Sequence, residues 1–221
     1  TNREDALAAC REGAHALGFI FYPRSPRFVS PDRAAEIIRG LPEGICRVGV
    51  FADEEPGEVA RIVRLCGLDL IQLHGKESPD YCALFPPRSL LKAVSLRGEE
   101  DLESLPRYPV KAILVDTYDP ALPGGTGRTG DWALARRAAT RHRVILAGGL
   151  KAENIRSALE AVKPSAIDVG SGVEAGPGKK DPRKLKEFLS LIKREGGGLP
   201  CPSLGNPVFE RATSCWADGQ W

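Results

Sequence analysis

The sequence predicts an α/β fold built on a parallel sheet. Seven short runs rich in Val, Ile, Leu and Phe alternate with segments in which apolar residues recur at helical spacing. Strict alternation with short connections is typical of parallel strands joined by right-handed helical crossovers. Two architectures satisfy this pattern, an open doubly wound sheet and a closed (β/α)8 TIM barrel.

The short apolar runs are predicted to be strands buried on both faces of the sheet. Near-continuous apolar runs of this length are typical of parallel strands, which lie between other layers of the fold. They occupy residues 16–22, 46–51, 68–75, 90–96, 111–117, 143–149 and 165–172.

Eight segments carry the signals of helices. Thr1 or Asn2 can cap the first one, and Glu4 and Asp5 load its first turn with negative charge. Ser30 precedes Pro-Asp, the pattern of an N-cap followed by proline at the first helical position. The segments are residues 1–13, 30–41, 55–67, 78–85, 99–107, 131–141, 151–162 and 181–195. Eight helices fit a barrel, but a barrel should begin with a strand, and here a helix comes first.

The composition is that of an ordinary globular protein. The 31 basic and 29 acidic residues nearly balance, so the charge gives no reason to expect nucleic acid or a membrane surface as partner. No signal peptide and no apolar run of membrane length are present, and the six cysteines form no CxxC pair, so we expect a protein of the reducing cytoplasm. The length suits one barrel over residues 1–195, followed by an irregular Gly- and Pro-rich tail over residues 196–221.

Reactive groups of such barrels gather at the carboxyl ends of the strands, where two Gly-rich segments indicate a phosphate site. Residues 146–149 ("LAGG") and 169–174 ("VGSGVE") end the last two predicted strands. Without Cβ atoms, glycines let backbone N–H groups approach an anion closely. The alternative is that both segments are ordinary tight turns between a strand and a helix.

Three side chains at strand ends are candidates for chemistry. Asp116 ends the run "AILVD" and can act as a general acid, or it can cap the next loop or pair with an arginine. Arg27 can bind an anionic group through two parallel hydrogen bonds, or it can be a surface arginine. His74 in "QLHG" is more typical of a structural histidine than of a catalyst. The Gly-rich "PGGTGRTGDW" that follows Asp116 can fold over a ligand or be a plain loop.

Several blocks together resemble the N-(5'-phosphoribosyl)anthranilate isomerase family of tryptophan biosynthesis. In chain order they are "ALGFIFYPRSPRFVSP", "RVGVFADE", "LIQLHGKE", "LVDTYDPALPGGTGRTGDW", "ILAGGLKAENI" and "IDVGSGVEAGPGKKDPRKL". The resemblance runs over residues 1 to 194 and is far more specific than any single glycine motif.

The resemblance implies a (β/α)8 barrel that carries out an Amadori rearrangement without a metal or cofactor. It implies a small phosphorylated substrate, and a monomer or a homodimer. Asp116 corresponds to the family's general acid, and Arg27 to the arginine that meets the anthranilate carboxylate. The family's phosphate-binding backbone falls on Gly148, Gly149, Ser171 and Gly172.

The family's general base is a cysteine in a Lys-Ile/Val-Cys-Gly-Ile/Leu-Thr segment on strand one. Thr1 corresponds to the threonine of that segment, so we expect strand one and its cysteine to be absent from the printed sequence. Such a chain would be a poor isomerase. Two alternatives stay open: a non-catalytic phosphate-ligand-binding fragment, and the related isomerase of histidine biosynthesis, for which the first half of the sequence lacks a second phosphate motif.

Overall fold

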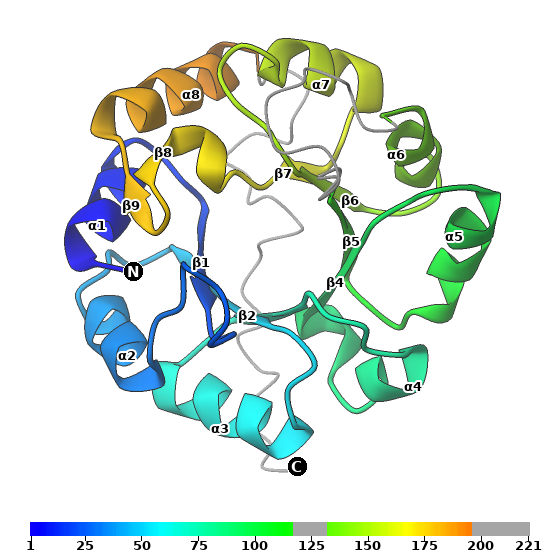
Figure 1. Ribbon diagram of the computed structural model, residues 1–221, viewed down its shortest axis with the longest axis horizontal. Helices are drawn as coiled ribbons and strands as arrows, with labels where there is room; N and C mark the ends of the chain where they lie inside the picture. The colour runs from blue at the N-terminus through cyan, green and yellow to red at the C-terminus, as the bar shows by residue number, and fades with distance from the viewer. Residues whose placement is uncertain (117–131, 196–221) are drawn as a thin grey trace.

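The computed structural model describes residues 1–116 and 132–195 as a curved parallel sheet with helices around its outside (Figure 1). The sheet has seven strands in the order β1 to β7, and every neighbouring pair is parallel. The strands are β1 (Ala16–Ile20), β2 (Cys46–Phe51), β3 (Leu70–Leu73), β4 (Leu90–Val94), β5 (Ala112–Asp116), β6 (Val144–Ala147) and β7 (Ala166–Ile167).

Helices alternate with these strands along the chain, as the sequence predicts. They are α1 (Arg3–Arg11), α2 (Pro31–Arg39), α3 (Pro56–Cys66), α4 (Pro79–Cys82), α5 (Glu99–Ser104), α6 (Trp132–Ala139), α7 (Ile155–Val162) and α8 (Pro182–Glu195). Short 3-10 turns are η1 (Pro87–Ser89), η2 (Leu105–Arg107) and η3 (Ser171–Val173). The prediction of a parallel α/β fold of the TIM-barrel type is confirmed. The predicted Gly-rich loop after Asp116 and the predicted tail lie outside the described residues.

Side chains at the start of the helices fix where they begin. The Asn2 side chain accepts a hydrogen bond from the Asp5 N–H at 2.8 Å, so Asn2 rather than Thr1 caps α1. Ser30 caps α2 in the same way, with Pro31 at the first helical position, as predicted. None of the helices within the described ranges has the length and apolarity that a bilayer span requires.

Both faces of the sheet are apolar. One face packs under the helices, while alternate strand residues point inward and pack against one another. Strand residues alone form this inner cluster: Cys46, Val48, Leu70, Leu91, Ala93, Ala112, Leu114, Ile145, Ala147 and Ala166. The inner cluster is therefore the floor on which a site at the carboxyl ends of the strands would lie.

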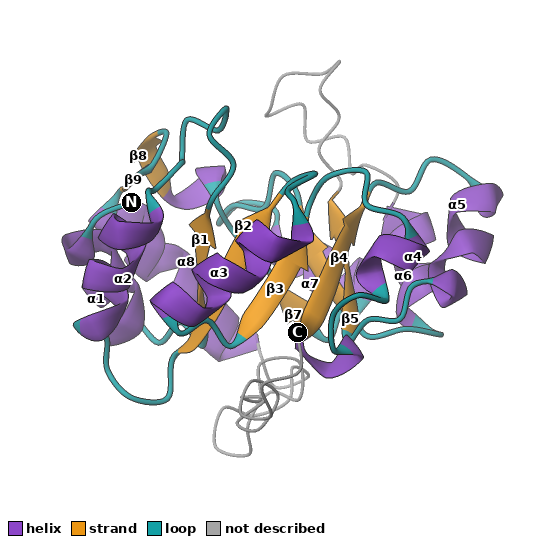
Figure 2. Cartoon of the chain, turned by 90° about the horizontal axis from the view of Figure 1, so that it is seen from below, coloured by secondary structure: helices purple, strands orange, loops and turns teal. Residues whose placement is uncertain are grey.

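One antiparallel hairpin, which the sequence did not predict, lies beside the end of β7. It consists of β8 (Glu174–Gly176) and β9 (Lys179–Lys180), and it contacts the chain start because the Thr1 hydroxyl donates to the Gly178 carbonyl oxygen. Figure 2 shows the hairpin and the N-terminus together on the side toward which the strands point.

The sheet has two open edges within the described residues. There β1 pairs only with β2, and β7 pairs only with β6, so these two strands are the ends of the strand order. In Figure 1 they are the two ends of the curved sheet, with α1 and the β8–β9 hairpin nearby. A barrel that closed on itself would have no such edges.

Candidate active site

Polar side chains lie directly beyond the inner apolar cluster. Gln72, Asp116 and Asp168 each follow a member of that cluster by two residues, so strand alternation places all three in inward-facing rows. The Asp168 N–H donates to the Leu146 carbonyl oxygen at 2.8 Å, which continues the sheet pairing of β7. The carboxyl ends of three strands thus present an amide and two carboxylates to the same interior.

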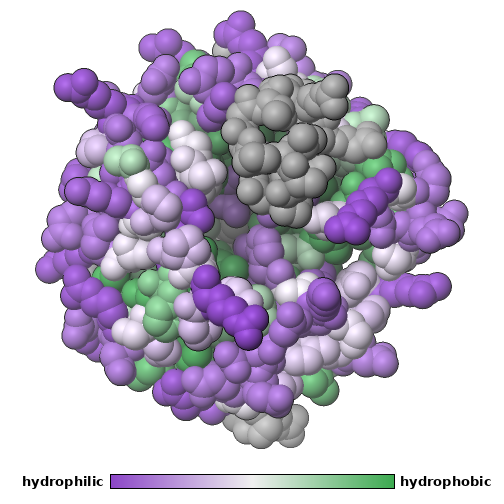
Figure 3. Space-filling model, in the orientation of Figure 1, coloured by the Kyte–Doolittle hydropathy of each residue, from purple (hydrophilic) through white to green (hydrophobic). Residues whose placement is uncertain are grey.

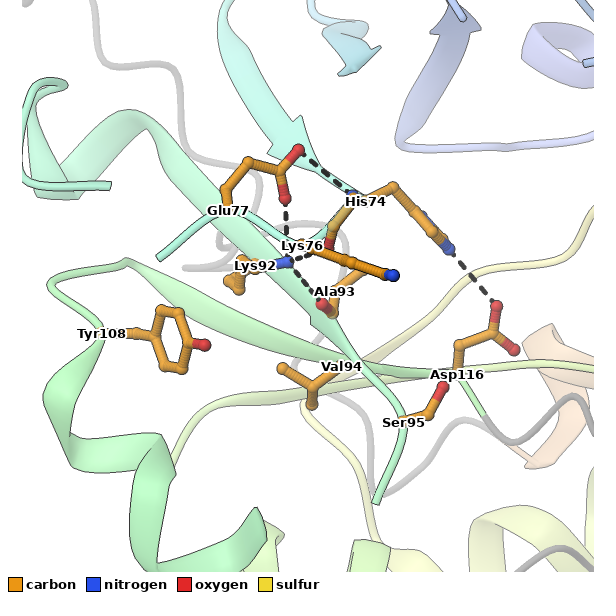
Figure 4. A pocket seen from close by; sticks show the side chains of 10 residues that line it. His74, Lys76, Glu77, Lys92, Ala93, Val94, Ser95, Tyr108 and Asp116 are labelled. Carbon is orange, nitrogen blue, oxygen red and sulfur yellow. Dashed lines mark hydrogen bonds and ion pairs between the residues drawn. The ribbon is translucent and has the colours of Figure 1, made fainter. Parts of the chain in front are cut away.

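His74 links two of these side chains (Figure 4). Nε2 of Gln72 lies 2.9 Å from Nδ1 of His74, and Nε2 of His74 lies 3.4 Å from Oδ2 of Asp116. Because the Gln72 amide nitrogen is a donor, Nδ1 accepts and the ring proton is assigned to Nε2. His74 can then donate to the Asp116 carboxylate and orient it.

The Asp116 side chain borders a cavity of about 250 Å³ at the ends of β3, β4 and β5. Figure 4 shows His74, Lys92, Tyr108 and Asp116 around it. The cavity is open to solvent on one side. Figure 3 looks onto this face and shows many hydrophilic side chains on it. A polar ligand can therefore reach the Asp116 carboxylate from solution.

A buried ion pair supports the loop that carries His74. Nζ of Lys92 lies 3.0 Å from Oε2 of Glu77, and the two side chains are 3% and 1% exposed. The same ammonium donates to the carbonyl oxygens of Leu73 and Gly75, while Oε1 of Glu77 accepts from the N–H of Gly75. Oε2 of Glu77 has no hydrogen bond of good geometry, so its interaction with Lys92 is an ion pair only. The pair fixes the path of the chain on either side of His74.

The second inward carboxylate, Asp168, has a perturbed environment. Its pKa is raised, first by desolvation and then by the negative charge of Asp116, while the charges of His74 and Lys180 act in the opposite direction. The residue is nonetheless exposed to solvent at the carboxyl end of β7. The charges of Asp116, His74 and Lys180 therefore all act on the Asp168 carboxylate.

The two Gly-rich segments lie against each other. A Cβ atom at Gly172 would stand 1.8 Å from the Leu150 carbonyl oxygen, so the loop after β7 packs on the backbone of the loop after β6. Gly148 and Gly149 directly follow β6 with φ angles of 84° and 63°, which favour glycine. Within the described residues, the N–H groups of Gly149, Ser171 and Gly172 donate to no protein acceptor. Each segment thus has at least one backbone N–H group without a protein acceptor among the described residues.

Arg27 is held by an acidic partner that the sequence did not reveal. Its Nε lies 3.0 Å from both carboxylate oxygens of Glu174, and its Nη2 lies 2.7 Å from Oε2. Lys180 joins this pair, since its Nζ lies 3.4 Å from Oε1 of Glu174 and 3.1 Å from the Gly170 carbonyl oxygen. These contacts connect Arg27 to the glycine loop after β7.

The predicted site residues therefore fall into three groups on one side of the sheet. Asp116 and His74 border the cavity, and the two glycine segments adjoin each other. Arg27, from the loop after β1, contacts Glu174 of the β8–β9 hairpin. No direct contact joins Asp116 to Arg27 among the described residues. Asp168 and Lys92 were not predicted, although each is a charged residue in or at the end of an apolar run.

Comparisons with known proteins point to one family. The sequence model of a family described as N-(5'-phosphoribosyl)anthranilate (PRA) isomerase matches residues 1–190. Isomerases of that name from Syntrophus aciditrophicus and Thermotoga maritima are 51% identical over 197 residues and 45% identical over 195 residues. These alignments cover 89% and 87% of this chain and 86% and 95% of the relatives.

Solved structures give the same result. The crystal structure of phosphoribosyl anthranilate isomerase from Thermotoga maritima is 43% identical, with a TM-score of 0.81. A structure of such an isomerase in complex with reduced 1-(o-carboxyphenylamino)-1-deoxyribulose 5-phosphate is 41% identical, with a TM-score of 0.78. Each comparison covers 88% of this chain and 95% of the other.

Proposed function

The chain belongs to the N-(5'-phosphoribosyl)anthranilate isomerase family, and from this membership we propose how its residues carry out the isomerisation. The reaction converts N-(5'-phosphoribosyl)anthranilate into 1-(2-carboxyphenylamino)-1-deoxyribulose 5-phosphate, a step of tryptophan biosynthesis. It turns an aminoaldose into an aminoketose, so it needs one acid and one base but no net gain or loss of atoms.

Asp116 is the proposed general acid. Its proton goes to the furanose ring oxygen, the bond from that oxygen to C1' breaks, and an iminium forms. A base then removes the proton from C2' to give an enolamine, which tautomerises to the ketone. The position of Asp116 beside an open cavity and within reach of His74 supports this role, because an acid must meet its substrate before it can transfer a proton.

The two ends of the substrate are proposed to bind at the two glycine segments and at Arg27. The backbone of Gly148, Gly149, Ser171 and Gly172 binds the phosphate, supported by the close packing of the two loops and by donors without a protein acceptor among the described residues. Arg27 binds the carboxylate of the anthranilate ring, supported by the part of its guanidinium that Glu174 leaves open.

A further strand is proposed to precede Thr1 and to carry the general base. The open edges of β1 and β7 would pair with a strand placed between them. Such a strand, parallel to both, would end on the side of the sheet where Figure 2 shows Thr1 and would lead directly into α1. The family's cysteine motif has this position relative to Thr1. We therefore propose that the printed chain alone is an impaired isomerase.

The remaining properties follow from the same proposal. The chain acts in the cytoplasm, which agrees with the free thiols of Cys10, Cys66 and Cys82. It acts as a monomer or a homodimer. One similar crystal structure, 40% identical, is of monomers generated from the dimeric isomerase of Thermotoga maritima. The proposed barrel domain comprises residues 1–195, and the tail over residues 196–221 is not part of it.

The observation that carries the proposal is the family membership over residues 1–190 together with Asp116 beside the cavity. Turnover of N-(5'-phosphoribosyl)anthranilate, followed as loss of its fluorescence, tests it. Binding of the reduced product analogue without turnover in any form of the chain would instead favour a non-catalytic phosphate-ligand-binding protein.

A further inference from the structure

The contact between Arg27 and Glu174 occupies one edge of the guanidinium and leaves another open. The Glu174 carboxylate accepts hydrogen bonds from the Nε–H and from one N–H of Nη2 of Arg27. Nη1 and the second N–H of Nη2 have no acceptor within the described residues. These N–H groups form a second edge of the planar guanidinium, which we call the outer edge. They can donate two parallel hydrogen bonds to a further carboxylate.

Glu174 is itself held in place. Its side chain is 5% exposed, whereas that of Arg27 is 30% exposed. Oε1 of Glu174 also accepts from the Gly178 N–H at 3.3 Å and contacts Lys180, while the Glu174 carbonyl oxygen accepts from Nζ of Lys184. A carboxylate fixed from several directions can restrict the rotation of the longer and more exposed arginine.

The charges near this contact favour a further anion. In the ion pairs of Glu174, Arg27 and Lys180 supply two positive charges against its one negative charge. Desolvation opposes the ionisation of Glu174, but hydrogen bonding from Arg27 and the charge of Lys180 keep its pKa below the ordinary value. Glu174 therefore stays ionised at neutral pH and keeps Arg27 in place.

We propose that Glu174 is a positioning residue that holds Arg27 so that its outer edge selects substrates with a carboxylate on the aromatic ring. This inference rests on the proposed function, because it assumes that Arg27 meets that carboxylate. Prior fixation of the guanidinium lowers the entropic cost of binding. Glu174 acts through Arg27 and touches neither the phosphate nor the reacting carbons.

Two ligands separate positioning from a merely structural role. The first is the reduced 1-(o-carboxyphenylamino)-1-deoxyribulose 5-phosphate, and the second is the same molecule with a phenylamino group that lacks the carboxylate. The dissociation constants of both are measured in the chain extended by the proposed N-terminal strand, as the wild type and as the Arg27→Ala, Glu174→Ala and Glu174→Gln variants. Thermal unfolding of each variant reports whether it is folded.

We expect Glu174→Ala to weaken binding of the carboxylate ligand about tenfold or more, the size of a lost hydrogen bond to a charged group. Binding of the ligand without the carboxylate should not change. Glu174→Gln, which keeps an acceptor for Arg27, should weaken the first ligand less. In the Arg27→Ala background, Glu174→Ala should have no further effect, because its only route to the ligand is gone.

Other results would overturn the inference. Equal weakening of both ligands by Glu174→Ala or Glu174→Gln would show a general structural role, and no weakening of either would show that Arg27 needs no positioning. If Arg27→Ala discriminates between the ligands and neither Glu174 variant does, the proposed function stands and only this inference fails. If the wild-type chain extended by the proposed N-terminal strand is folded and binds neither ligand, the proposed function fails with it.

Discussion

Gly172 packs directly on the backbone of Leu150, with only 1.8 Å between the place of a Cβ atom and the Leu150 carbonyl oxygen. This contact brings the loop after β7 against the backbone of the loop after β6, and a side chain at position 172 would hold the two loops farther apart. The site proposed for the phosphate therefore depends on a residue that contributes no side chain at all.

Gly172→Ala should abolish binding of the reduced product analogue or weaken it by more than tenfold, because the methyl group must push the two loops apart. Calorimetric titration measures the dissociation constant. Gly170→Ala is the matched control in the same loop, since a Cβ atom there meets nothing within 4 Å. Equal effects of the two substitutions would contradict the role given to the packing.

Asp116→Asn should lower kcat by about 10² to 10⁴, the usual contribution of a general acid. The measurement uses a chain that carries the proposed N-terminal strand and its cysteine. His74→Ala should lower kcat less, because His74 only orients Asp116. In the Asp116→Asn background, His74→Ala should change nothing further. An additional loss there would mean that His74 has a role of its own.

Asp168→Asn should stabilise the fold at neutral pH. The pKa of Asp168 is raised by desolvation and by Asp116, so the folded chain binds the Asp168 proton more tightly than the unfolded chain does. Ionisation therefore costs stability above the raised pKa, and this cost disappears as the pH falls below the ordinary value of 3.8. The gain in Tm from the substitution should shrink over the same range.

Asp181→Ala should change the Tm in the opposite direction to Asp168→Asn, lowering it at neutral pH. Hydrogen bonds from the backbone N–H groups of Lys184 and Arg183 hold the pKa of Asp181 below its ordinary value. Its ionised form therefore stabilises the fold at neutral pH, and this stability is lost as the pH falls through the lowered pKa. A gain in Tm from Asp168→Asn that did not depend on pH would contradict the electrostatic explanation.

Lys92→Met should destabilise the fold by about 3 to 5 kcal/mol, because it leaves the charge of Glu77 buried without a partner. Urea unfolding measures this loss. Adding Glu77→Gln should recover part of it, since the amide oxygen can still accept from the Gly75 N–H without a buried charge. A double variant less stable than Lys92→Met alone would show that the hydrogen bonds of Glu77, not its charge, are decisive.

The helices and strands could be predicted because each has a local signal. Ser30 followed by proline marks the start of α2, and apolar runs mark all seven strands. The prediction was too long at β7, where residues 165–172 contain only two strand residues and then the turn η3. Glycine and serine in that segment suit a turn as well as a strand end, so the run alone could not place the boundary.

The site could be predicted only where a single residue stood out from its sequence neighbours. Asp116 ends an apolar run, and alternation alone would have added Asp168, which also ends one. The partner of Arg27 lies 147 positions away, on a hairpin too short to show a strand pattern. Contacts of that range depend on the curvature of the whole sheet.

Turnover of N-(5'-phosphoribosyl)anthranilate by three forms of the chain tests the proposed mechanism most directly. They are the printed chain, the chain extended before Thr1 by a strand with the family's cysteine motif, and the same extension with alanine in place of that cysteine. We predict rapid turnover by the cysteine form and a rate about 10² to 10⁴ lower for the alanine form. The printed chain should be no better than the alanine form. Failure of the cysteine form to turn over substrate while folded would contradict the proposed mechanism.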